Sequence, residues 1–160
     1  MYAFRFPVFF ALVVLFSCTK AVQEKPEDGV DEAISLEKKI ERLKSERAKW
    51  NTFTINNYSF DQQLSCFCVW HMTEKYSVTV RNKTIVAVDD APVDPELHNH
   101  LKTIDAIFDY VLQLLAEKPY KINITYHSTF GFITSFDVDR NKRIADEEHG
   151  YSFTNFSVAD

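Results

Sequence analysis

Glycine is scarce in this chain, which has only three glycines among its 160 residues. Loops that cradle a phosphate, in dinucleotide-binding proteins and in P-loop enzymes, need several glycines at close and fixed spacing, because the backbone must approach the phosphate closely. Gly29, Gly131 and Gly150 are far apart, so no such loop can be drawn. The composition therefore disfavours nucleotide-binding enzymes.

Catalytic motifs are lacking as well. The chain contains neither the Gly-x-Ser-x-Gly turn of the serine hydrolases nor the His-Glu-x-x-His helix of zinc proteases. No pair of a nucleophile and a base can be named from the sequence. We therefore predict no catalytic residues and no cofactor other than calcium, and we favour a protein that is not an enzyme.

Positive charge is in deficit, since 18 lysines and arginines face 23 aspartates and glutamates, for a net charge of −5. An acidic surface lacks the electrostatic attraction that nucleic acids and anionic membranes exert on basic proteins. We predict no nucleic-acid partner. The expected partner is extracellular and of unknown kind.

Long hydrophobic runs are absent except for Phe6–Phe16, which spans about 11 residues, whereas a membrane-spanning helix needs roughly 20. Arg5 precedes this run and the small stretch Ser17–Thr19 comes after it, an order that is typical of an export signal. We predict a signal peptide over residues 1–21, which is removed and leaves no transmembrane span. A flexible tether is expected over 22–30 and a single domain over 31–160.

Two export routes fit this leader. In the first, Leu15–Cys18 is a bacterial lipobox, Cys18 is lipidated, and the protein is anchored in the cell envelope. In the second, a eukaryotic secretory signal is cut near Ala21. The chain has four Asn-x-Ser/Thr acceptor motifs where chance predicts about one. We therefore favour a secreted glycoprotein, with N-glycosylation candidates at Asn57, Asn82, Asn123 and Asn155.

Hydrophobic periodicity predicts an α+β fold. Apolar residues at helical spacing predict one helix over 31–50 and another from a Thr103 cap to about Glu117. Alternating patterns predict six strands, at 57–70, 76–81, 84–88, 120–126, 132–138 and 151–158. The order is α-β-β-β-α-β-β-β. Because the connections are short, we expect one antiparallel sheet of about six strands with both helices packed on one face.

Strand alternation also bears on the glycosylation candidates. Asn57 and Asn123 are expected to point away from the apolar face, and Asn82 to lie in a hairpin turn. Asn155 shares its parity with the inward-facing Tyr151 and Phe153. It is therefore predicted to suit a glycan less well.

Cys66 and Cys68 form a Cys-x-Cys pair on the predicted strand 57–70. Alternate Cα atoms of an extended strand lie roughly 6.5–7 Å apart, near the upper limit for a disulfide, although a bulge at Phe67 would bring them closer. The pair is either structural, as a disulfide or as two small buried residues, or a redox-active or metal-binding thiol site. We favour a structural pair, because no lysine, arginine or histidine lies within two residues to lower a thiol pKa.

Residues 137–148 resemble an EF-hand calcium loop. Asp137, Asp139, Asn141 and Glu148 occupy loop positions 1, 3, 5 and 12. However, Lys142 stands where the sharp turn requires glycine, and the flanking segments resemble strands rather than helices. We favour a polar hairpin loop with Asx turns and keep calcium binding as an alternative.

His98 and His100 lie in a loop as Glu-Leu-His-Asn-His. Alternate histidines can bind zinc, but no third ligand is visible nearby in the sequence. We interpret them as surface histidines.

Several motifs occur in a characteristic order along the chain. They are Trp50, Tyr58–Phe60, Ser65–Cys68, Tyr76–Val80, Thr103–Phe108, Tyr126–Phe132, Asp137–Asp139 and Ile144–Tyr151. With these motifs the chain resembles domain-of-unknown-function family 6174, a group of exported domains that are often labelled as lipoproteins. The resemblance covers about Trp50–Val158 and is strongest at the Tyr126–Gly131 block and the Ala-Asp-Glu-Glu loop after it. It implies export, a compact α+β fold and an acidic loop shared by the family, and it implies no activity.

Taken together, these patterns favour an exported, non-catalytic domain with an extracellular binding or structural role. Two alternatives remain open. One is a thiol-redox or metal-binding protein built on Cys66 and Cys68, and the other is a calcium-binding module over residues 137–148.

Overall fold

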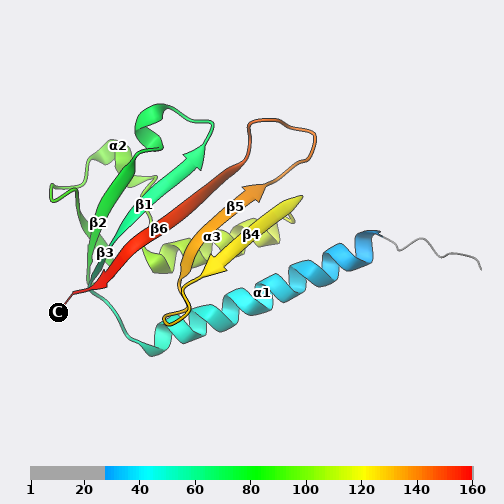
Figure 1. Cartoon of the computed structure of the whole chain (residues 1–160), viewed down its shortest axis with the longest axis horizontal. Coiled ribbons are helices and arrows are strands. Elements are labelled where there is room, and N and C mark those ends of the chain that lie inside the picture. The colour runs from blue at the N-terminus through cyan, green and yellow to red at the C-terminus, as the bar shows by residue number, and fades with distance from the viewer. Residues whose placement is uncertain (1–27, 160) are drawn as a thin grey trace, which may run out of the picture.

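A computed structural model describes residues 28–159 as a six-stranded antiparallel sheet with helices on one face (Figure 1). The strand order is β3-β2-β1-β6-β5-β4. The elements are α1 (Asp28–Thr52), β1 (Tyr58–Cys66), the 3-10 helix η1 (Trp70–Met72), β2 (Lys75–Arg81), β3 (Thr84–Val88), α2 (Pro95–His98), α3 (Ile104–Ala116), β4 (Lys121–Tyr126), β5 (Ile133–Asp139) and β6 (His149–Val158). The predicted fold class is confirmed.

The structure does not describe residues 1–27. These include the predicted signal peptide with Cys18 and the first six residues of the predicted tether. Helix α1 begins at Asp28, three residues before the predicted start. Within the described part of the chain, no helix combines the length and the apolar character that crossing a membrane requires.

Helix α1 packs through the apolar stripe that its sequence predicts. Leu43 and Trp50 are buried, and the Trp50 ring makes edge contacts with Tyr58, Phe132 and Phe156 at centroid distances of 5.8–5.9 Å. The Trp50 Nε1–H donates to a carboxylate oxygen of Asp105, at the start of α3, over 3.3 Å. This one side chain therefore ties α1 to both the sheet and α3.

Helix α3 begins at its predicted cap. The Thr103 hydroxyl accepts a hydrogen bond from the Ala106 N–H over 3.1 Å, which satisfies one of the free donors of the first turn. One face of the helix is buried, through Ile104, Ile107, Phe108, Val111, Leu114 and Leu115. The predicted amphipathic pattern is confirmed.

The hairpin between β2 and β3 turns at Asn82 and Lys83, whose φ angles are +49° and +62°. Two successive left-handed residues are typical of the tight turn whose twist matches the flanking strands. The predicted turn is confirmed.

Strands β1 and β6 join two three-stranded meanders along the middle of the sheet. They run antiparallel, so the last residue of β1, Cys66, lies beside the first residue of β6, His149. This pairing brings the Cys-x-Cys segment and the end of the acidic loop to the same end of the sheet.

The first predicted strand, 57–70, was too long. Strand β1 ends at Cys66, and Trp70 lies in η1 with 73 % of its surface exposed rather than facing the core. The alternation of apolar residues continues past Cys66 in the sequence, but a Cys66–Cys68 disulfide turns the chain away from the sheet at that point.

The predicted orientation of Asn155 is wrong. β6 carries a bulge opposite Ser59–Asp61, and Asn155 has a left-handed φ of +52°. An extra residue in one strand reverses the parity of the residues after it. Asn155 is therefore exposed, with its Nδ2 donating to Asp61, and Phe156 packs inward against Trp50 instead.

Candidate functional site

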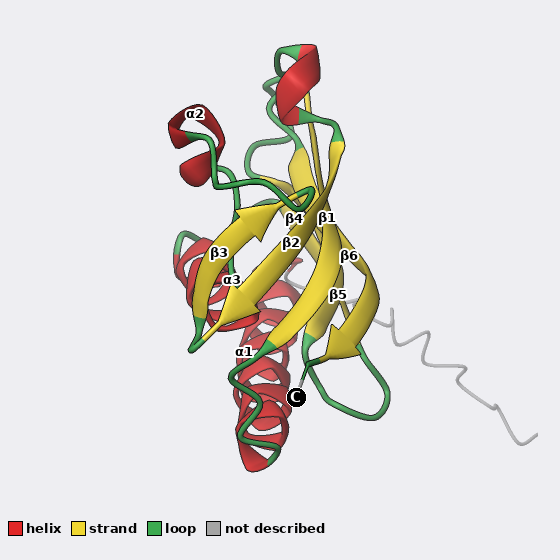
Figure 2. Ribbon diagram, turned by 90° about the vertical axis from the view of Figure 1, so that its left-hand side faces the viewer, coloured by secondary structure: helices red, strands yellow, loops and turns green. Residues whose placement is uncertain are grey.

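A large exposed apolar cluster stands at one end of the sheet. Phe67, Val69 and Trp70 expose 83 %, 56 % and 73 % of their surfaces, and we call these three residues the aromatic tip. They lie in the segment between β1 and β2, whose short helix projects beyond the strands in Figure 2. The Cys66–Cys68 disulfide, with a Cα–Cα separation of 5.3 Å, closes the chain around Phe67.

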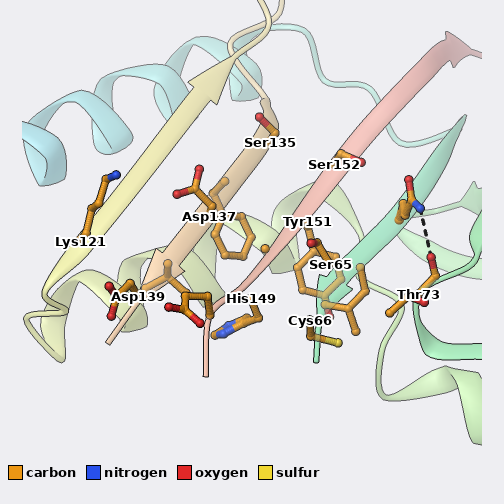
Figure 3. A pocket seen from close by; sticks show the side chains of 16 residues that line it. Ser65, Cys66, Thr73, Lys121, Ser135, Asp137, Asp139, His149, Tyr151 and Ser152 are labelled. Atoms are coloured by element: carbon orange, nitrogen blue, oxygen red, sulfur yellow. Dashed lines mark hydrogen bonds between the residues drawn. The ribbon is translucent and has the colours of Figure 1, made fainter. Parts of the chain in front are cut away.

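Hydrogen bonds fix the base of the aromatic tip. The Thr73 hydroxyl donates to the Trp70 carbonyl over 2.8 Å, and Tyr76 Oη donates to the His71 carbonyl over 2.5 Å. From β1, Gln63 Nε2 donates to the Thr73 carbonyl over 3.1 Å, which Figure 3 draws as a dashed line. The exposed side chains thus stand on a segment whose backbone is held in place.

A hollow of about 340 Å³ lies beside the tip. The disulfide and Leu64 form part of its wall, and most of the other lining side chains can donate hydrogen bonds, so we call it the donor pocket. Its polar side chains come from the segment before α3, from α3 itself, from the β5–β6 connection and from β6. They are Asn99, His100, Lys102, Tyr110, Arg140, His149 and Tyr151.

His149 lies between Tyr110 and Arg140. Its Nε2 is 2.7 Å from Tyr110 Oη, and its Nδ1 is 3.4 Å from Arg140 Nη1. A guanidinium can only donate, so this contact favours the tautomer in which Nδ1 accepts and Nε2 carries the ring proton toward Tyr110 Oη. Burial lowers the pKa of His149, and the positive charge of Arg140 lowers it further. Both effects favour the neutral imidazole.

Lys102 is positioned by a buried amide. Gln62 is 2 % exposed; its Oε1 accepts from the Lys102 backbone N–H over 2.9 Å, and its Nε2 donates to the His100 carbonyl over 3.0 Å. The Lys102 ammonium lies 5.1 Å from the centre of the Tyr110 ring. Partial burial lowers the pKa of Lys102, and none of the ion pairs among the described residues includes it.

A wider hollow of about 790 Å³ lies on the open face of the sheet, where His149 also forms part of the wall (Figure 3). Three of the four predicted calcium ligands, Asp137, Asp139 and Glu148, line it. Asp137 accepts a hydrogen bond from Asn123 Nδ2 over 2.8 Å. One carboxylate oxygen of Asp139 is buried and has no hydrogen-bond partner within residues 28–159.

Although three of the predicted calcium ligands share this hollow, their side chains are not placed to hold one ion, and Asn141 does not line it. Asn141 instead folds back locally, with its Oδ1 accepting from the Arg143 N–H over 3.1 Å, as in an Asx turn. Among the described residues, no three side chains from histidine, cysteine, aspartate and glutamate are placed to hold a metal ion. Calcium binding by Asp137, Asp139, Asn141 and Glu148 stays a prediction that this arrangement does not favour.

His98 is the last residue of α2, and its side chain lies outside what the structure describes, so a zinc site at His98 and His100 is not tested. The His100 carbonyl accepts from Tyr151 Oη over 3.0 Å as well as from Gln62. Its contribution in the structure is therefore to anchor the loop through its backbone.

Three of the four glycosylation candidates lie at the end of the sheet opposite the aromatic tip. Asn57 precedes β1, Asn82 forms the β2–β3 turn and Asn155 is near the end of β6. Asn82 and Asn155 are exposed, whereas Asn57 is half-buried and accepts from the Asn82 N–H over 3.0 Å. The fourth, Asn123, is exposed on the edge strand β4. Glycosylation at these positions stays a prediction.

The sequence pointed to the Cys-x-Cys pair but not to the donor pocket. Lys102, Tyr110, Arg140 and His149 come from three separate segments, and no local spacing connects them. The prediction that no cation lies near the cysteines considered sequence neighbours only. Pairing of β1 with β6 brings His149 to Cys66, and the β5–β6 connection brings Arg140 to the same pocket.

Comparison with known protein families gives a match over most of the described chain. The model of a family described as a family of unknown function, DUF6174, matches residues 42–158. The resemblance noted from the sequence is thereby confirmed. No curated protein and no solved structure matches the chain at a significant level.

Proposed function

The chain belongs to DUF6174, a family of unknown function, and from that premise we propose that it is an exported domain that binds another protein and carries out no reaction. The aromatic tip is the contact surface. Cys66 and Cys68 act structurally, as the disulfide that shapes this surface.

One observation carries the proposal, namely the exposure of Phe67, Val69 and Trp70 on a segment fixed by a disulfide and hydrogen bonds. Large apolar side chains that gather on a surface are typical of interaction sites. Tryptophan is among the residues that contribute most to binding at protein interfaces. A segment that is already ordered also loses less conformational entropy on binding.

A protein partner is favoured over a lipid surface. The net charge of −5 opposes approach to anionic membranes, and Glu74 lies directly after the tip segment. Beside the tip, the donor pocket offers several hydrogen-bond donors, which suit a polar group of a protein. Export is supported by the leader-like first 21 residues together with a disulfide, since disulfides persist in oxidising compartments.

To test the tip, a photo-reactive residue is placed at position 67 or 70 of the full chain in its native cells, with position 84 at the opposite end of the sheet as control. We expect a protein cross-linked from positions 67 and 70 and not from 84. Direct titration of that purified protein should then show binding at least 30-fold weaker to Trp70→Ser, because loss of an interfacial tryptophan costs about 2 kcal/mol or more.

Three outcomes would contradict the tip proposal. One is cross-linking from position 84 to the same protein, and another is unchanged affinity of Trp70→Ser. The third is cross-linking from the tip to lipid alone, which would assign the surface to a membrane instead.

Export and the state of the cysteines are tested together by the intact mass of the natively expressed protein, with and without a mild reductant. We expect a chain without its leader in which Cys66 and Cys68 stay oxidised. Glycan masses would support the secreted form, and an acylated Cys18 would support the lipid-anchored form. An unprocessed chain in the cytosol would contradict export.

A second candidate, thiol–disulfide exchange, is favoured by one observation. The donor pocket brings Lys102 and Arg140 to the wall that Cys66 and Cys68 form, and cations near a cysteine stabilise its thiolate. The same mass measurement separates the candidates. A pair that mild reductant opens would favour exchange over a structural disulfide.

A further inference from the structure

We propose that the donor pocket binds a single carboxylate group of the partner protein while the aromatic tip holds an apolar side chain next to that group. This inference rests on the proposed function, because the pocket and the tip share the Cys66–Cys68 segment. The carboxylate is either the C-terminus of the partner chain or an aspartate or glutamate side chain.

The charge of the pocket points to an anion. The chain has more acidic than basic residues, yet the pocket wall includes Lys102 and Arg140 and no aspartate or glutamate. Arg140 is paired outside the wall with Glu117, at 3.3 Å between Nε and the carboxylate. Lys102 has no such pair among residues 28–159. Because a partly buried cation without a counter-ion is costly, a bound anion would stabilise this arrangement.

The hydrogen-bond directions also suit an anion. In the tautomer in which His149 Nδ1 accepts from Arg140, the ring proton lies on Nε2 toward Tyr110 Oη, and the Tyr110 hydroxyl keeps its own proton free to donate. The Lys102 ammonium, close to the same ring, adds further donors. Donors that converge on one small hollow match the acceptor-only oxygens of a carboxylate.

One free positive charge selects a singly charged ligand. Arg140 is largely neutralised by Glu117, so the net charge offered to a ligand is close to that of Lys102 alone. This matches a carboxylate better than a doubly charged phosphate group. Gln62 holds the backbone of Lys102 in place, so only the side chain of this residue has to be ordered when the ligand binds.

The test uses three short probes and the full chain. The probes are N-acetyl-leucyl-leucine with a free C-terminal carboxylate, its C-terminal amide, and N-acetyl-leucyl-aspartic acid α-amide, in which the side-chain carboxylate is the only free carboxylate. Each is titrated and followed by the NMR amide shifts of the protein. We expect at least one carboxylate probe to bind about tenfold or more tightly than the leucyl-leucine amide, as a charge-assisted hydrogen bond would give. The better of the two identifies the source of the carboxylate.

Variants place the effect in the pocket. Lys102→Gln and Tyr110→Phe should each weaken the preferred carboxylate probe about three- to tenfold and leave the amide unchanged. Lys44→Gln, at an exposed lysine of α1, is the matched control and should change neither. Thermal melts of each variant establish that it is folded before its affinity is compared.

Equal binding of acid and amide probes would overturn the inference, as would a folded Lys102→Gln variant that binds the acid as well as the wild type does. Trp70→Ser separates this failure from failure of the tip. If Trp70→Ser loses the partner and acid and amide probes bind equally, the tip proposal stands and the pocket inference falls. If the acid probes bind more tightly than the amide but Trp70→Ser still binds the partner as the wild type does, the pocket inference is supported and the tip proposal is not.

Discussion

Trp50→Ala is expected to lower the free energy of unfolding by about 3–5 kcal/mol, which is the usual cost of truncating a large buried aromatic side chain to alanine. Trp50 is 2 % exposed and its ring contacts Tyr58, Phe132 and Phe156. The change leaves a cavity where α1, the sheet and α3 meet. It also removes the partner of an Asp105 carboxylate oxygen. Because small domains are stable by only about 5–15 kcal/mol, this is a large fraction of the total.

Urea unfolding monitored by circular dichroism measures this effect, and Trp70→Ala is the matched control. The same side chain is removed there, but Trp70 is 73 % exposed, so the expected loss is below about 0.5–1 kcal/mol. Equal destabilisation by the two variants would contradict the assignment of Trp50 to the core and Trp70 to the surface. Trp70→Ala should instead weaken partner binding without weakening the fold.

The two tryptophans also show what periodicity in the sequence can and cannot predict. Trp50 continues the helical spacing of Leu36, Ile40 and Leu43, and its burial follows from that pattern. Trp70 continues the alternation of the strand before it, so the same reasoning placed it inside. Nothing in the alternation reveals that the disulfide between Cys66 and Cys68 ends the strand.

Bulges limit the prediction in the same way. Alternation fixes which face a residue occupies only while the strand stays regular. The irregularity at Asn155 reverses the faces for the rest of β6 and exposes a residue predicted to point inward. The helices were predicted well because the cap at Thr103 and the apolar face of α3 are both local features of the sequence.

The donor pocket lies beyond such reasoning because it depends on strand pairing. Tyr110 and His149 are 39 residues apart, and they meet because α3 packs against the sheet and because the register of β1, β5 and β6 places His149 beneath it. A single sequence contains the residue types but not the register. The aromatic tip was partly predictable, because the Cys66 and Cys68 pair is visible in the sequence and marks the segment that contains the tip.

Gly150→Ala is expected to lower the free energy of unfolding by about 3 kcal/mol, at the upper end of what inserting one methyl group into a tightly packed site costs. A Cβ at this position would lie 2.2 Å from the Phe136 carbonyl oxygen and 3.1 Å from the Asp137 Cα. Both are backbone atoms of β5, so no flexible side chain can move away. Strands β5 and β6 must separate instead, and β5 alone connects β4 to the rest of the sheet.

Ser152→Ala is the matched control for this change, because Ser152 lies two residues further along β6 and also lines the hollow on the open face (Figure 3). It is expected to change the free energy of unfolding by less than about 1 kcal/mol. In the Gly150→Ala variant, amide hydrogen exchange should show reduced protection first in β4 and β5, because these strands depend on the β5–β6 pairing. A Gly150→Ala variant as stable as the wild type would contradict the close approach of the two strands.

Since His149 precedes Gly150, the same separation would also move the imidazole that contacts Tyr110. Gly150 therefore supports the donor pocket as well as the sheet.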